Sequence, residues 1–231
     1  MTSMASYADL DPAFLPIHDL CRPATMTSVE RMYALYKAVE YVLAAGIPGD
    51  FVECGVWRGG SVMVMAATLV SMGCLDRRIW LYDTFAGMTP PTEHDVDVAG
   101  RDAGVLLTAD PKSEDSFYWG IAPMDLVRAN LAKVPYPAQL YNFVPGPVEQ
   151  TIPRSIPERI ALLRLDTDWY ESTRHELLYL YPLLEKQGVL CIDDYGYWKG
   201  SRKAVDEYFA AANRTILLNR IDTTGRIAIK S

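Results

Sequence analysis

Apolar side chains recur along the chain at two spacings, one typical of helices and the other of buried strands. In the segment 26–46 they return every three or four residues, which predicts a helix that Thr27 or Ser28 caps and Gly46 ends. Shorter apolar runs, bounded by glycine, proline and polar residues, predict strands. Five of these runs lie at 50–56, 79–83, 138–146, 160–166 and 188–194.

Helical spacing returns between most of these strands. Further helices are expected at 62–72, 124–134, 171–187 and 201–213. Ser201 would cap the last of them. Two segments show neither spacing. Residues 1–25 are expected to form an irregular N-terminal arm. Residues 84–121 are expected to form an active-site loop, because a loop of that length in a compact domain usually has a function.

The alternation of strands and helices implies a parallel, doubly wound sheet that binds ligands at the carboxyl ends of its strands. The last two apolar runs, 215–219 and 226–230, are separated by a turn-like DTTG segment, so they should pair antiparallel. This pattern predicts an α/β fold of the class I S-adenosylmethionine (SAM)-dependent methyltransferase type. The Rossmann-like sheet would be seven-stranded and mainly parallel, with a C-terminal antiparallel strand. We expect residues 1–231 to form a single domain.

The overall charge restricts the partners that the chain can bind. The net charge is −7, and no basic run is longer than Arg77-Arg78, which argues against sequence-independent nucleic-acid binding. No apolar stretch reaches the roughly 18 residues of a membrane span, and no secretory signal is evident. The four cysteines form no CxxC pair and are expected to be reduced. We therefore expect a cytoplasmic protein with no nucleic-acid or membrane partner.

Acidic side chains stand at the ends of the fourth and fifth predicted strands. LDTDWYES supplies Asp166 and Asp168, and IDDYG supplies Asp193 and Asp194. If the two strands are neighbours, these carboxylates crowd one edge of the sheet and repel each other unless a cation or a proton intervenes. Oxygen ligands suit Mg²⁺, and the lack of His or Cys among them argues against zinc. The alternative is that these aspartates cap the helices that follow.

A glycine-rich turn, VECGVWRGGS, closes the first strand at 52–61. Its glycines allow the backbone to approach a ligand, and the following helix N-terminus favours an anion. In a methyltransferase that anion is the methionine carboxylate, with Ser61 as donor, and Glu53 would face the methionine ammonium group. Asp83 ends the second strand, where an acidic side chain accepts ribose hydroxyls. A structural turn and an Asx turn are the alternatives, and Asp83 would serve NAD equally well.

Two other groups of residues are candidates for the acceptor side of the site. His94 lies in the long loop and would approach a substrate when that loop closes, although a solvated polar loop is the alternative. Several aromatic residues at strand ends and in loops would form an apolar cleft for a ring-bearing substrate, although each alone is more often packed in a core. They are Trp57, Phe85, Trp119, Trp169, Tyr170, Tyr195, Tyr197 and Trp198.

Together these segments resemble the macrocin O-methyltransferase (TylF/MycF-like) family. Its members are SAM- and Mg²⁺-dependent sugar O-methyltransferases of natural-product pathways. The resemblance rests on TMTSVERMYALYKAVEYV, DFVECGVWRGGS, YDTFAGM, PTEHDVD, RLDTDWYEST and IDDYGYWKGSRKAVDEYF. A more distant similarity is to catechol-type O-methyltransferases, which share a Glu and a Ser around the first turn, here Glu53 and Ser61.

The resemblance implies a set of roles for these residues. Asp166, Asp193 and Asp194 would hold Mg²⁺, with two vicinal hydroxyls of a sugar completing the coordination. The metal would lower the pKa of one hydroxyl and align it with the methyl–sulfur bond. The hydroxyl proton needs a base, for which Asp168 is the first candidate and His94 the second, while Asp166 is an alternative. The cofactor contacts would be Thr27, Glu53, Gly55, Trp57, Ser61, Asp83, Phe85 and Asp166.

We therefore expect Mg²⁺-dependent transfer of a methyl group from SAM to a hydroxyl of a sugar or glycosylated natural product. One alternative is O-methylation of a catechol or another vicinal diol. An alternative from another class is a noncatalytic nucleotide-binding domain, against which the three ligand carboxylates argue. The missing GxGxxG motif and the closing hairpin argue against an NAD oxidoreductase. A homo-oligomer formed through the N-terminal arm is the protein partner that we expect.

Overall fold

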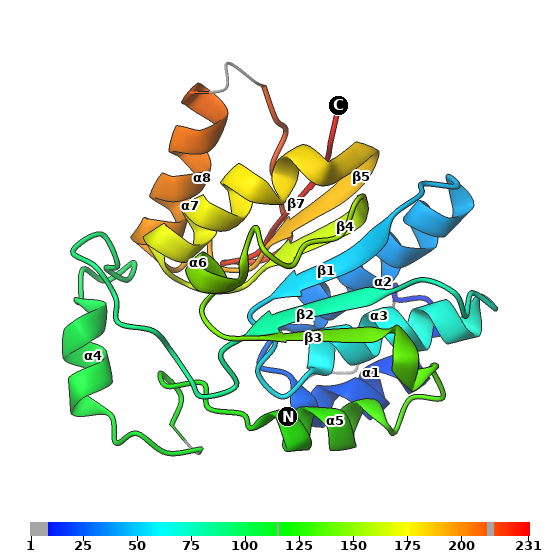
Figure 1. The fold of residues 1–231 in the computed structure, drawn as a ribbon, viewed down its shortest axis with the longest axis horizontal. Coiled ribbons are helices and arrows are strands. Elements are labelled where there is room, and N and C mark those ends of the chain that lie inside the picture. The colour runs from blue at the N-terminus through cyan, green and yellow to red at the C-terminus, as the bar shows by residue number, and fades with distance from the viewer. Residues whose placement is uncertain (1–8, 115, 212–214) are drawn as a thin grey trace.

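A computed structural model describes residues 9–114, 116–211 and 215–231. Within them a seven-stranded sheet has the order β3-β2-β1-β4-β5-β7-β6 (Figure 1). The first five strands are parallel, and β7 is antiparallel to β5. This confirms the predicted class of fold. The strands are β1 (Asp50–Cys54), β2 (Ile79–Asp83), β3 (Tyr141–Pro145), β4 (Ile160–Leu165), β5 (Leu184–Ile192), β6 (Asn219–Arg220) and β7 (Arg226–Ile229).

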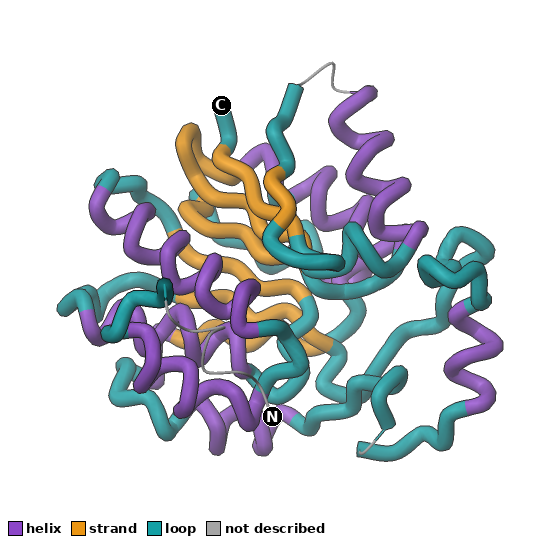
Figure 2. The backbone as a smooth tube through the Cα atoms, turned by 180° about the vertical axis from the view of Figure 1, so that it is seen from behind, coloured by secondary structure: helices purple, strands orange, loops and turns teal. Residues whose placement is uncertain are grey.

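Helices cover both faces of the sheet. One layer, in front in the view of Figure 2, contains α1 (Phe14–Cys21), α2 (Val29–Ala44), α3 (Gly60–Ser71) and α5 (Met124–Leu131). The other contains α6 (Val148–Thr151), α7 (Tyr170–Tyr179) and α8 (Lys199–Ala211). The short helix α4 (Ala103–Ala109) stands beside the sheet. Because β4 lies in the middle of the sheet, all six of its residues are buried, which explains its continuous apolar run.

Residues 14–24 of the predicted irregular arm are helical, in contrast to the prediction. Residues 1–8 lie outside the described part of the chain, but α1 is a helix whose Phe14 and Cys21 are fully buried in the core. Pro16 lies in the first turn of α1, where the backbone N–H has no intrahelical acceptor, so it does not break the helix. The 3₁₀ turn η2 (Arg22–Ala24) then leads into the start of α2. Eight residues are too few for the spacing of apolar side chains to reveal a helix.

Several other elements also differ from the prediction, among them the first predicted strand of the closing hairpin, which is only Asn219–Arg220. The helix expected over 171–187 ends at Tyr179, because Pro182 lies in a 3₁₀ turn, η4 (Tyr181–Leu183), and β5 begins directly after it. Helix α8 begins at Lys199, so Ser201 is inside its first turn and is not the N-cap. The loop 84–121 contains α4, whose N-cap Asp102 accepts a hydrogen bond from the backbone N–H of Val105. In the described residues no helix combines the length and the apolar character that a membrane crossing requires.

The turn between β6 and β7 is fastened to the start of α2. Asp222 accepts hydrogen bonds from the Ser28 hydroxyl (2.6 Å) and from Arg31 Nε (2.9 Å). Its other oxygen accepts the backbone N–H groups of Thr224 and Gly225. Burial alone would raise the pKa of Asp222, but these hydrogen bonds and the charge of Arg31 lower it to about 2.

This low pKa predicts how an Asp222→Asn variant responds to pH. The folded protein holds the ionised form more tightly than the unfolded chain does, so the contribution to stability is complete above about pH 4 and is lost as the pH falls towards 2. We expect the variant to lose about 1–2 kcal/mol of unfolding free energy at pH 7 and progressively less below pH 4. Urea denaturation of both proteins from pH 7 to pH 3 measures this difference, and a loss independent of pH would contradict the electrostatic explanation.

Candidate active site

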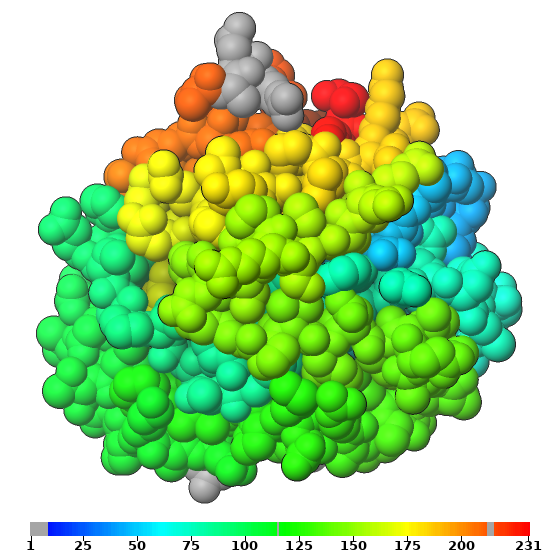
Figure 3. Space-filling view, in the orientation of Figure 1, coloured from blue at the N-terminus to red at the C-terminus, as the bar shows by residue number. Residues whose placement is uncertain are grey.

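A cavity of about 400 Å³ opens at the carboxyl ends of the central strands. Its floor comes from the ends of β1, β2, β4 and β5, and its rim includes residues 24–27 before α2 and residues of the 84–121 segment. In the ribbon of Figure 1 this segment swings out beyond the sheet, but side chains fill the space beside it (Figure 3). The cavity is therefore where a parallel α/β sheet is expected to bind ligands.

The glycine-rich turn brings β1 and α3 close to the cavity. Gly55 has a φ of +81°, and a Cβ atom there would lie 1.8 Å from the Asp166 carbonyl oxygen, so only glycine allows the two strand ends to meet. A Cβ atom at Gly60 would lie 2.5 Å from the Ala24 carbonyl oxygen. The absence of a side chain at Gly60 allows the N-terminus of α3, with Ser61, to lie against the segment that precedes α2.

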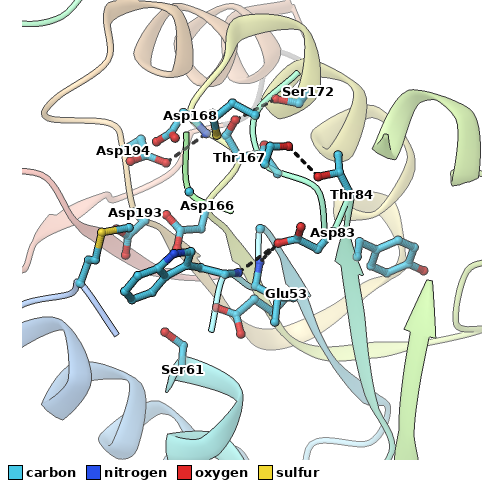
Figure 4. A pocket seen from close by; sticks show the side chains of 18 of the residues that line it. Glu53, Ser61, Asp83, Thr84, Asp166, Thr167, Asp168, Ser172, Asp193 and Asp194 are labelled. Carbon is cyan, nitrogen blue, oxygen red and sulfur yellow. Dashed lines mark hydrogen bonds between the residues drawn. The ribbon is translucent and has the colours of Figure 1, made fainter. Parts of the chain in front are cut away.

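Asp83 holds the turn and also lines the cavity (Figure 4). One carboxylate oxygen accepts the backbone N–H groups of Val56 (2.6 Å) and Trp57 (3.0 Å), and the other accepts that of Phe85 (2.7 Å). Burial raises the pKa of Asp83, and these three hydrogen bonds oppose that rise. The Asx turn given above as the alternative for Asp83 is therefore present, and Asp83 also lines the cavity.

Glu53 is a buried carboxylate with one free oxygen. Its side chain is 1% exposed and forms an ion pair with Arg164 through Oε1. Oε2 has no hydrogen-bond partner among the described residues, although Glu53 lines the cavity. Burial raises the pKa of Glu53 to about 7, while Arg164 opposes the shift. An unpaired buried carboxylate oxygen at a cavity wall suits a cationic ligand group.

Asp166, Asp168 and Asp194 gather on one wall of the cavity (Figure 4). Each offers a carboxylate oxygen that lies within 4.8 Å of the others. Asp168 has a φ of +66°, and its backbone N–H donates to Asp194 Oδ2 at 3.2 Å. Burial raises the pKa of Asp168 to about 7 and the pKa of Asp166 and Asp194 well above their usual range, with mutual repulsion adding to the effect. Such a cluster is the electrostatic complement of a divalent cation.

Asp193 lies in two ion pairs, apart from this group of three. Its Oδ1 contacts Arg164 and its Oδ2 contacts Arg31. Neighbouring residues at a strand end point in opposite directions, so Asp194 turns towards Asp168 while Asp193 turns towards the two arginines. The structure thus brings together Asp166 and Asp194 of the expected ligand set, with Asp168 in the place where Asp193 was expected.

The chain resembles a known family of enzymes in its sequence. The profile of the macrocin-O-methyltransferase (TylF) family matches residues 19–229. The chain belongs to this family.

Two relatives and one solved structure support the assignment. The chain is 36% identical over 223 residues to 8-demethyl-8-(2,3-dimethoxy-alpha-L-rhamnosyl)-tetracenomycin-C 4'-O-methyltransferase of Streptomyces olivaceus, covering 94% of this chain and 79% of the relative. It is 34% identical over 186 residues to mycinamicin III 3''-O-methyltransferase of Micromonospora griseorubida, covering 80% and 69%. The solved O-methyltransferase NovP aligns with a TM-score of 0.78 at 30% identity, over 90% of this chain and 82% of that one. The protein is therefore an enzyme with O-methyltransferase activity.

Most residues that were expected to contact the cofactor line the cavity. They are Thr27, Glu53, Gly55, Trp57, Ser61, Asp83 and Asp166. Phe85 is outside the described lining residues, because its ring packs against Phe143 at a centroid distance of 5.9 Å. His94 is also outside the lining, since its ring lies edge-on against Tyr170 at 4.5 Å.

The 84–121 segment is anchored through Asp95, an acidic residue that the sequence patterns did not single out. Asp95 is fully buried. Its Oδ2 accepts hydrogen bonds from Thr92, and its Oδ1 accepts the backbone N–H of Tyr170 (2.7 Å) at the start of α7. The loop is thereby joined to the element that follows Asp168. The EHD sequence of the loop gave no signal that its aspartate would cap a distant helix.

Aromatic and apolar side chains form the rim opposite the glycine-rich turn. The lining residues of this rim are Met88, Thr89, Phe117, Tyr118, Tyr197 and Trp198. Trp169 supports them from behind, since its indole N–H donates to the Thr89 carbonyl at 2.9 Å and its ring packs against Trp198. Of the aromatic residues expected around a cleft, Trp57, Tyr197 and Trp198 line it, whereas Trp169 and Tyr170 lie in the supporting structure.

Proposed function

We propose that this O-methyltransferase uses Mg²⁺ to transfer the methyl group of SAM to a hydroxyl of a sugar or glycosylated natural product. The observation that carries the proposal is that one cavity combines a cradle for the methionine end of SAM with a cluster of three carboxylates. The relatives named above methylate a rhamnosyl tetracenomycin and mycinamicin III, and this supports a glycosylated acceptor.

The cavity fits SAM through groups of matching charge. Glu53 Oε2 has no hydrogen-bond partner in the described chain and suits the methionine ammonium group. The N-terminus of α3, with Ser61, suits the methionine carboxylate. Asp83 is bonded to three backbone N–H groups, but a carboxylate offers about four lone-pair positions, so it retains acceptors for ribose hydroxyls. Thr27, Gly55 and Trp57 complete this end.

The carboxylate cluster fits Mg²⁺, which prefers oxygen ligands and keeps positions open for substrate oxygens. Asp166 and Asp194 would hold the ion, since both belong to the expected set and both offer an oxygen at the cluster. Asp193 would be the third ligand after release from Arg31. When bound, Mg²⁺ would lower the pKa of an acceptor hydroxyl. Asp168, which lines the cavity beside these ligands, would accept the proton of that hydroxyl.

An acceptor screen with isotopically labelled SAM tests the proposal. The panel contains glycosides with vicinal hydroxyls, the matching aglycones and simple catechols, each with Mg²⁺ and with a chelator. We expect labelling of one or more glycosides, no labelling of their aglycones, and loss of labelling with the chelator. Labelling confined to catechols would support the alternative acceptor class. Failure to bind SAM or S-adenosylhomocysteine (SAH) in calorimetry would contradict the use of this cofactor.

A further inference from the structure

Arg164 is a buried cation at the centre of the proposed site. It is the one charged residue in the sequence of β4, and its side chain is 4% exposed. Its guanidinium contacts carboxylates from three adjacent strand ends. Nη1 donates to Glu53 Oε1 (2.5 Å) on β1 and to Asp166 Oδ2 (2.6 Å) after β4, and Nη2 donates to Asp193 Oδ1 after β5.

The arrangement contains more negative charge than a structural ion pair requires. Burying an arginine is costly unless it is paired, and one carboxylate would neutralise it. Apolar side chains surround Arg164 along β4, and replacing a buried ion pair by apolar residues is often neutral or stabilising. Here one guanidinium meets three carboxylates, one of which, Asp193, also contacts Arg31, and all three line the cavity. A single structural ion pair therefore does not account for the arrangement.

Each contact orients a carboxylate that has a separate part in the proposed function. Arg164 occupies Oε1 of Glu53 and leaves Oε2 without a protein partner among the described residues. It occupies Oδ2 of Asp166, one of the three residues whose oxygens gather within 4.8 Å. The planar guanidinium fixes donors in a rigid fork, so these carboxylates have a defined orientation relative to each other.

We infer that Arg164 is a positioning residue that links the methionine end of the cofactor site to the metal site. By fixing Glu53 on one side and Asp166 and Asp193 on the other, it orients both sites through a single buried group. This inference rests on the proposed function, because it concerns the residues through which SAM and Mg²⁺ would be held. Without Arg164, Glu53 and Asp166 would lose their ion-pair partner and Asp193 would keep only Arg31, so the three carboxylates would no longer share a fixed orientation.

Two variants and one matched control test this role. Arg164→Met removes the charge and keeps much of the volume, and Arg164→Lys keeps the charge but loses the fork. Arg159→Met is the control, because Arg159 precedes the same strand and forms an exposed ion pair with Glu185. Calorimetry measures SAH affinity without metal, and electron paramagnetic resonance measures Mn²⁺ affinity without cofactor. Thermal unfolding reports on the fold of each variant.

We expect Arg164→Met to raise both dissociation constants by about tenfold or more, as substitutions behind metal ligands do. Arg164→Lys should raise both by a smaller factor, and Arg159→Met should change neither. If folded Arg164 variants bind both ligands like the wild type, or lose only one affinity, the linking role is wrong. If both variants fail to fold while Arg159→Met folds, Arg164 is a structural residue and the inference is also wrong. If the wild type binds neither ligand, the proposed function fails, and the inference fails with it.

Discussion

Replacing Asp194 by asparagine is expected to lower kcat/KM for methyl transfer by about a thousandfold. Asp194 is buried and offers one of the three oxygens that lie within 4.8 Å of each other. Asparagine keeps the size of the side chain and can still accept the backbone N–H of Asp168, but it removes the negative charge that a hard cation requires. Metal-assisted catalysis supplies several kcal/mol, and each 1.4 kcal/mol or so corresponds to a factor of ten.

The measurement is steady-state kinetics with an acceptor from the screen, over a range of Mg²⁺ concentrations. SAH affinity measured without metal should not change in Asp194→Asn, since this side chain lies outside the cofactor contacts. Asp206→Asn is the matched control, because Asp206 is an exposed aspartate on α8 that accepts a hydrogen bond from the Tyr195 hydroxyl. Its activity should stay within about twofold of wild type. Full activity of Asp194→Asn, or wild-type activity in excess chelator, would exclude the metal.

The second large effect is expected from Asp168→Asn, which should lower kcat by about 10²- to 10⁴-fold, the usual contribution of a general base. The backbone of Asp168 is left-handed, with a φ of +66°. Asparagine adopts this conformation more readily than most residues, so the substitution should preserve the turn and its N–H contact with Asp194. The variant should therefore retain its affinity for both SAH and Mn²⁺ while losing turnover.

A second variant, Asp193→Asn, distinguishes a metal ligand from a general base. If Asp193 is the third ligand, its substitution weakens Mn²⁺ binding while Asp168→Asn does not. The opposite pattern, with metal affinity lost in Asp168→Asn and retained in Asp193→Asn, would mean that the group of three seen in the structure is the ligand set. The base would then have to be another group. The two variants together distinguish these arrangements without depending on the identity of the acceptor.

The sequence predicted those elements and candidate site residues whose conformation depends mainly on residues nearby in the chain. The apolar run of β4 and the exact span of β2 follow from the burial of central strands, which leaves no polar face. The position of Gly55 follows from local chemistry, because a tight turn after a strand needs a residue without a side chain. The position of Asp83 follows because it ends a predicted strand, at the edge of the sheet where ligands bind. The single arginine within the apolar run 160–166 was an available signal for Arg164, since a charge in a buried strand requires a partner.

Two features of the structure depend on contacts between distant segments and could not be predicted from local sequence. His94 was placed near a substrate by its loop, yet Asp95 ties that loop to α7 and leaves the histidine ring against Tyr170. Helix α1 was missed, because its identity depends on burial of Phe14 and Cys21 against the rest of the core. These contacts join residues far apart in sequence, so the spacing of apolar residues along the chain does not predict them.

The sequence by itself determined the order of strands and helices, the antiparallel ending and the presence of four aspartates at two strand ends. It did so because apolar periodicity and turn chemistry are local properties. Only the tertiary structure decided which oxygens meet. Asp193 and Asp194 are adjacent in sequence, but one faces Arg31 and Arg164 and the other faces Asp168. The reason is geometric: the direction of a side chain at a strand end is set by the elements that pack around it.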